Sequence, residues 1–258
     1  MGTLSPLRKA ILVVGGLLSL GVITFSTLSM IDWMARTTDE HDTDITPQRQ
    51  SIVIHNSGDI TVTPSPDDKV HVHTRVRYGL SKPQLFEQSA SDGVILEARC
   101  HGWAGFDSCD VHYEVTVPAS FRVEVLASVG DVSATGLTGT VTLSTTAGDV
   151  EANGLTGPLT LRSTVGDVYG TGLRSDTVQA RTSAGDVSLS FAASPHSVDA
   201  HSTVGDVDVA VPPGRYRVQA SSGAGDQFVD AALQSGDSDL RIDVSSNAGD
   251  VTVRRALA

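Results

Sequence analysis

Seven aspartates, each placed directly after a glycine, recur through the second half of this 258-residue chain. The Gly-Asp pairs of this series lie 18, 18, 19, 20, 20 and 24 residues apart, and one further pair in this half of the chain, Gly236-Asp237, falls outside the series. Stacked carboxylates could hold a cation such as Ca²⁺, but calcium-binding β-rolls supply several oxygen ligands per site and this chain supplies one aspartate per repeat. We therefore favour a turn role, in which each carboxylate accepts backbone N–H groups, and we predict no metal and no cofactor. The pairs are Gly130-Asp131, Gly148-Asp149, Gly166-Asp167, Gly185-Asp186, Gly205-Asp206, Gly225-Asp226 and Gly249-Asp250.

The residues between these pairs predict short β-strands. Residues 139–156 and 157–174 align without gaps, and apolar and polar residues alternate within each, as at Val141 and Leu143. Strand, tight turn, strand and a second glycine-rich turn fill 18–20 residues, which is one coil of a β-solenoid. An antiparallel sandwich is the alternative, since it also has short strands at regular spacing. We expect the small apolar residue before each repeated glycine, such as Val129, to point inward, and the serines and threonines to be hydrated.

Residues 50–127 predict a less regular β region. Pro83–Ser89 predicts a short helix, because proline suits a first helical turn. Gly58-Asp59 resembles an early copy of the repeated turn. His71 and His73 share a strand face, but a metal site needs a third ligand that the sequence does not place, so exposed histidines are the favoured interpretation. The expected strands are residues 51–55, 59–63, 70–77, 93–99, 110–117 and 121–126.

The N-terminal segment predicts a membrane anchor. Residues 10–31 are apolar and uncharged, and as a helix they would span about 33 Å. Arg8 and Lys9 precede the segment and acidic residues follow it, so residues 1–9 are expected in the cytoplasm and the chain after Trp33 outside. Residues 32–49 are polar and are expected to form a linker. A cleaved signal peptide is the alternative.

Two cysteines, Cys100 and Cys109, enclose a short loop. Outside the membrane such a pair favours a disulfide. A metal site formed with His101 and His112 is the alternative, although paired zinc-binding cysteines normally lie closer together.

The strand ending at Val117-Pro118, followed by serial Gly-Asp-Val turns, resembles the bacterial putative-adhesin family of β-strand-repeat proteins, whose function is unassigned. The resemblance covers roughly residues 50–253. It implies a β-solenoid at the cell envelope, often with an N-terminal membrane helix, and it implies no catalytic residues. Residues 193–197 and 212–215 depart from the Gly-Leu-Thr-Gly turn of the earlier repeats.

We therefore expect an all-β fold, with a parallel-coiled β-solenoid after one transmembrane helix. The expected segments are 1–9, 10–31, the linker 32–49, a β region at 50–127 holding the Cys100–Cys109 loop, and the Gly-Asp solenoid at 128–258. The expected function is non-enzymatic: adhesion, scaffolding or envelope sensing outside the cell membrane, with an envelope protein or glycan as partner. The alternative is a β-helix enzyme acting on envelope polysaccharide. A net charge of −12 disfavours nucleic acid as a partner.

Overall fold

The computed structural model describes residues 15–16, 18–27, 36–79, 82–90, 93–99 and 109–256. The chain divides into two units. The smaller takes in the described residues within Met1–Asp39, Val76–Gln84 and Cys100–Asp110, and the larger those within Glu40–Arg75, Leu85–Arg99 and Val111–Ala258.

In the smaller unit, residues 15–16 and 18–27 are helical. Within the described residues, no helix combines the length and the apolar character needed to cross a membrane. The segment expected at 10–31 includes residues outside the described ranges, and its membrane role stays a prediction. Elsewhere in this unit, Asp39 accepts hydrogen bonds from Lys82 Nζ at 2.8 Å and from the Tyr78 hydroxyl at 3.0 Å, and both lower the pKa of Asp39.

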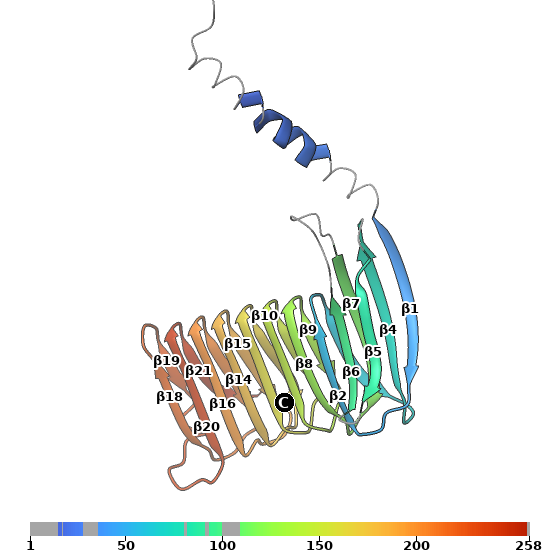
Figure 1. Cartoon of the computed structure of the whole chain (residues 1–258). Coiled ribbons are helices and arrows are strands. Elements are labelled where there is room, and N and C mark those ends of the chain that lie inside the picture. The colour runs from blue at the N-terminus through green and yellow to red at the C-terminus, as the bar shows by residue number, and fades with distance from the viewer. Residues whose placement is uncertain are drawn as a thin grey trace, which may run out of the picture. The chain divides into compact units, whose positions relative to one another are not determined.

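The strands form two sheets (Figure 1). In spatial order, the first is β1 (Thr37–Ile45), β4 (Val70–Tyr78), β7 (Cys109–Pro118), β3 (Ile60–Ser65), β9 (Val132–Thr135), β11 (Val150–Asn153), β13 (Val168–Leu173), β15 (Val187–Phe191), β17 (Val207–Val211), β21 (Val251–Arg255) and β19 (Gln227–Val229). The second is β18 (Arg217–Ser222), β20 (Arg241–Ala248), β16 (Ser197–Val204), β14 (Thr177–Ala184), β12 (Leu159–Val165), β10 (Val141–Ala147), β8 (Arg122–Val129), β2 (Ser51–Asn56), β6 (Gly93–Arg99) and β5 (Gln84–Ala90).

Along the repeats, neighbouring strands pair in parallel and in register. Val141 of β10 lies beside Leu159 of β12, and Val150 of β11 beside Val168 of β13. All four of these side chains are buried, so each coil places its apolar residues on those of the next coil. The all-β class with parallel sheets is thereby confirmed, and the antiparallel sandwich is wrong for these repeats. The larger unit winds in coils, as a solenoid does.

Stacking order departs from chain order at both ends of the repeat series (Figure 1). The coil of β20 and β21 lies between the coil of β16 and β17 and the coil of β18 and β19. Likewise, the coil of β2 and β3 lies between the coil of β8 and β9 and strands β6 and β7. The first and last coils of the chain are therefore each enclosed by a coil from farther inside the sequence.

Three expectations about the first half need correction or refinement. The helix expected over Pro83–Ser89 is wrong: residues 84–90 form β5 beside β6, and inward and outward residues alternate along it with the two-residue period of a strand. The expected linker contains β1 at residues 37–45. The expected boundary between residues 127 and 128 falls inside β8, so β8 and β9 form one coil across it.

Candidate functional site

The repeated aspartates lie in one column at the turn between the two sheets. The backbone N–H of each donates to Oδ1 of the aspartate one coil before it, at 2.7–3.0 Å. Charged acceptors strengthen such bonds, so each carboxylate that accepts one fixes the turn of the adjoining coil. In stacking order the column is Asp59, Asp131, Asp149, Asp167, Asp186, Asp206, Asp250 and Asp226.

Glycine is required beside this column for two reasons. Gly148 has a φ of 142°, a conformation that side chains rarely adopt. A Cβ atom added there would also meet the carbonyl oxygen of Gly130 on the neighbouring coil. The same relation holds at Gly166, Gly185, Gly205, Gly225 and Gly249, each of which meets the glycine carbonyl of an adjacent coil.

A second column, inside the coil, links serine and threonine hydroxyls to these glycine carbonyls. Each hydroxyl belongs to a residue three positions before its own glycine and donates to the glycine carbonyl of the preceding coil at 2.7–3.0 Å. The expectation that hydroxyls of the repeats are hydrated is wrong here, because most of these side chains are buried. The donors are Thr145, Ser163, Thr182, Ser202, Ser246 and Ser222.

Two members of this column differ from the others. Asn56 of β2 donates from Nδ2 to the carbonyl oxygen of Val111 at 2.6 Å. Ala127 of β8 lies between Asn56 and Thr145 in the register, and its methyl group cannot donate. The column therefore has a gap at Ala127.

The residues before the repeated glycines were expected to point inward, and this is wrong. Val129, Val165 and Val204 are 60%, 57% and 56% exposed. The reason is that the inner corner is already filled by the hydroxyl and the glycine carbonyl that it binds. These residues form an outward row of alternating valine and alanine in register on successive coils: Val129, Ala147, Val165, Ala184, Val204 and Ala248.

The carboxylates of the column accept hydrogen bonds from the turns of neighbouring coils. Within the described ranges, no group of three or more histidine, cysteine, aspartate or glutamate side chains is arranged to hold a metal ion. At one turn the second carboxylate oxygen is also engaged, since the Tyr169 hydroxyl donates to Asp167 Oδ2 at 2.7 Å. This hydrogen bond, together with partial burial and the neighbouring carboxylates, raises the pKa of Tyr169 to about 12. The cation ladder stays untested.

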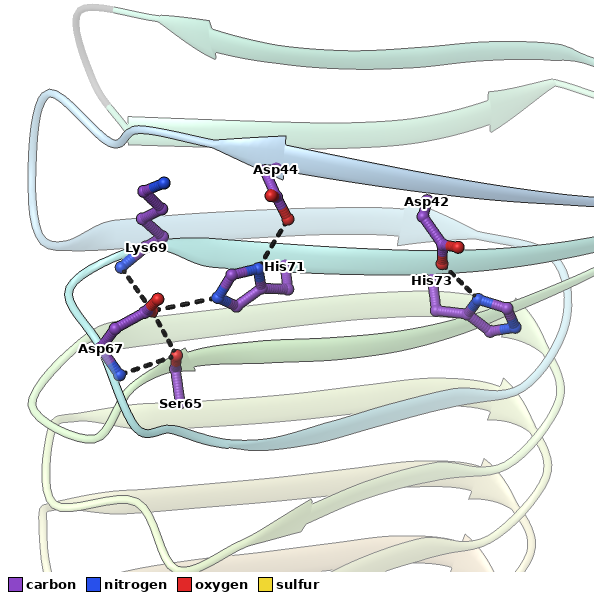
Figure 2. A network of polar contacts seen from close by, with 7 residues as sticks. All are labelled: Asp42, Asp44, Ser65, Asp67, Lys69, His71 and His73. Carbon is purple, nitrogen blue, oxygen red and sulfur yellow. Dashed lines mark hydrogen bonds and ion pairs between the residues drawn. The ribbon is translucent and has the colours of Figure 1, made fainter.

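A second polar cluster lies on β1 and β4 (Figure 2). His71 Nδ1 is 2.6 Å from Asp44 Oδ1, and His71 Nε2 is 3.0 Å from Asp67 Oδ1. His73 Nδ1 is 2.6 Å from Asp42 Oδ1. The hydrogen bonds to Asp44 and then Asp67 raise the pKa of His71, and the bond to Asp42 raises that of His73. Asp67 also accepts from Ser65 and from the Lys69 backbone, which with His71 lower its pKa to about 2.

Sequence reasoning anticipated the Gly-Asp turns and missed two other features. The hydroxyl column has a signal, namely serine or threonine three positions before nearly every repeated glycine. The acidic side of the second cluster lies in the segment taken for a linker, where Glu40, Asp42 and Asp44 recur with the period of a strand. Of the cysteines, Cys109 begins β7 while Cys100, like His101, lies outside the described residues, so the disulfide stays a prediction.

Comparison with known proteins gives one family match. The sequence profile described as Toastrack DUF4097 matches residues 103–254, more than half of the chain. A comparison with curated proteins finds no significant match.

Three solved structures are similar to the chain at low identity. A putative adhesin from Bacteroides fragilis is 17% identical over 84% of this chain and 97% of its own, with a TM-score of 0.44. A putative cell adhesion protein from Clostridium sporogenes is 12% identical over 85% and 100%, with a TM-score of 0.40. A putative lipid binding protein from Parabacteroides distasonis is 10% identical over 85% and 97%, with a TM-score of 0.36. At such TM-scores these similarities support no conclusion about this chain.

Proposed function

Since this chain belongs to the Toastrack DUF4097 family, we propose that it is a non-enzymatic cell-envelope protein whose coils present a repeated contact surface for adhesion or scaffolding. One observation carries the proposal: outward side chains occupy the same place on successive coils. Ser144, Arg162 and Arg181 follow one another in register on β10, β12 and β14. Parallel neighbours lie about 4.8 Å apart, so a partner with repeating groups can contact many equivalent positions at once.

The hydroxyl column supports a non-enzymatic role. A serine or threonine nucleophile needs a free hydroxyl beside a base. The hydroxyls of Thr145, Ser163 and Thr182 instead donate to glycine carbonyls of the preceding coil and hold the stack together. The column of serine and threonine hydroxyls, which could have supplied nucleophiles, thus has a structural role.

The cellular place is part of the proposal. Residues 10–31 would anchor the chain in the membrane, residues 1–9 would stay in the cytoplasm, and the coils would extend outside. Envelope sensing through a membrane partner is a further role open to such an arrangement.

Cell display tests the proposal. Cells that make the full chain should adhere to isolated envelopes, and protease added to intact cells should remove a C-terminal tag. Deletion of residues 10–31 should abolish adherence. The R162S/R181S double substitution should weaken adherence, while the matched R254S/R255S control, which alters two arginines outside this column, should not. Equal adherence of cells with and without the chain would reject the proposal.

The alternative of a polysaccharide-degrading enzyme has a separate readout. Purified full chain incubated with envelope polysaccharide should release no new reducing ends. Their steady release, lost on a single aspartate substitution, would favour the enzyme.

A further inference from the structure

β1 is the strand at one edge of the first sheet, and β4 is its neighbour in that sheet. Of its nine residues, Ile45 is the one fully buried apolar residue, at 7% exposure. On its inner side, Thr43 donates to Glu87 Oε2 at 2.6 Å. Because so little apolar area is buried, the docking of β1 depends mainly on backbone pairing and on polar contacts.

Three charged pairs connect β1 to β4. Asp44 contacts His71, Asp42 contacts His73, and Glu40 Oε1 lies 3.0 Å from Arg75 Nε. Residue numbers rise on one strand as they fall on the other, so the strands run antiparallel. Figure 2 shows the two histidine pairs side by side along the strands. Two of the three positive partners are histidines, and these are the ones that change charge near neutral pH.

Further carboxylates face the same histidines. Asp67, from the loop between β3 and β4, contacts His71. Glu114 of β7 and Glu40 of β1 act on His73 through their charge. With both histidines protonated, these two and Arg75 give three positive charges against five carboxylates, a balance of 3 − 5 = −2. With both neutral, the balance becomes 1 − 5 = −4, and β1 meets unpaired negative charge.

We propose that β1 is a pH-dependent clasp, docked on β4 while His71 and His73 carry protons and loosened as they lose them, which leaves the edge of the sheet at β4 unpaired. The proposal does not depend on the proposed function. Its direction follows from the raised pKa of both histidines. Their contribution to docking is complete below the ordinary histidine pKa of about 6.5 and declines as pH rises through the raised values.

Hydrogen exchange of the full chain in detergent tests the clasp. The measured quantity is the protection factor of amides 37–45 between pH 5.5 and 8.5, corrected for the intrinsic exchange rate at each pH. Protection should fall about tenfold for each unit by which a histidine pKa is raised. Amides of β12, which belongs to the other sheet, should keep their protection and show that the fold is intact.

Two variants and a control separate charge from structure. H71R/H73R keeps the positive charge at all pH values, like Arg75, and should hold residues 37–45 protected up to pH 8.5. H71Q/H73Q should show low protection throughout. H201Q is the matched control, because His201 Nδ1 contacts the Ser245 hydroxyl at 2.9 Å instead of a carboxylate, and it should behave as the wild type. Flat wild-type protection, or an equal decline in H71R/H73R, would overturn the proposal.

Discussion

Replacement of Asp149 by asparagine or by alanine separates the two roles considered for the aspartate column. Asp149 Oδ1 accepts the backbone N–H of Asp167 at 2.7 Å, in a partly buried turn. Alanine removes the acceptor and leaves that N–H unpaired, at a cost of about 1–3 kcal/mol. Asparagine keeps an oxygen acceptor, but the bond weakens by about 1 kcal/mol because a bond to a charged group is the stronger kind.

Both variants also remove a charge from the column. Carboxylates one coil apart, about 4.8 Å, repel by about 0.9 kcal/mol at the dielectric constant of water and by about 3.5 kcal/mol at an effective value of 20. Asp149 has two such neighbours, Asp131 and Asp167. Both variants gain the same relief of repulsion. In D149N this relief offsets the weaker bond, so D149N should match the wild type within about 1 kcal/mol. D149A has lost the acceptor altogether and should be about 1–2 kcal/mol less stable than D149N.

Urea unfolding of the full chain in detergent, at low and high salt, measures both variants. High salt screens the repulsion between the carboxylates of the wild type. The stability of D149N relative to the wild type should therefore be lower at high salt than at low salt. Added Ca²⁺ should not change the free energy of unfolding of either variant or of the wild type. The reasoning fails if D149N is as unstable as D149A, or if millimolar Ca²⁺ stabilises the wild type and not D149N, since a charged carboxylate would then be essential.

Three further substitutions test other parts of the fold by thermal unfolding. Ala127→Ser supplies the missing hydroxyl of the inner column and should raise stability by about 1 kcal/mol, or about 2–4 °C, while Ala127→Val should not; equal effects would remove the hydrogen bond as the cause. Gly166→Ala forces a Cβ against the carbonyl of Gly148 and should cost at least about 1 kcal/mol more than Gly154→Ala, where the space is open; equal costs would contradict the steric argument. The Tyr113 hydroxyl is buried with no hydrogen-bond partner among the described residues, so Tyr113→Phe should be neutral or stabilising, and a clear loss of stability would reveal a contact.

The repeats could be predicted because the spacing of the turns and the alternation of apolar residues indicated the same structure. The spacing of Gly148-Asp149 and Gly166-Asp167, together with the alternation of apolar and polar residues between them, indicated stacked coils with aligned turns. The orientation of Val129 could not be predicted, because alternation stops where the corner is closed by a hydroxyl and a glycine carbonyl. These partners lie on different coils, so the closure depends on tertiary packing.

The N-terminal end was harder to read for a related reason. The segment 32–49, which contains Asp42 and Asp44, has the polar composition of a linker when it is considered without its partners. β1 forms because β4 presents His73 and His71 at matching positions about thirty residues away in sequence. Strand pairing between distant segments is set by such partners more than by local propensity. In the same way, no local signal distinguishes the coil of β20 and β21 from the outer coil of β18 and β19.

The enclosed position of the final coil sets an order for synthesis. As the chain emerges, β18 and β19 are made before β20 and β21, yet the surface on which they rest is provided by β20 and β21. β18 and β19 therefore lack their neighbours until β20 and β21 have been synthesised and have paired with β16 and β17. A truncated chain ending near residue 240 would therefore carry a segment with nowhere to dock, and it should be degraded faster than one ending at residue 211.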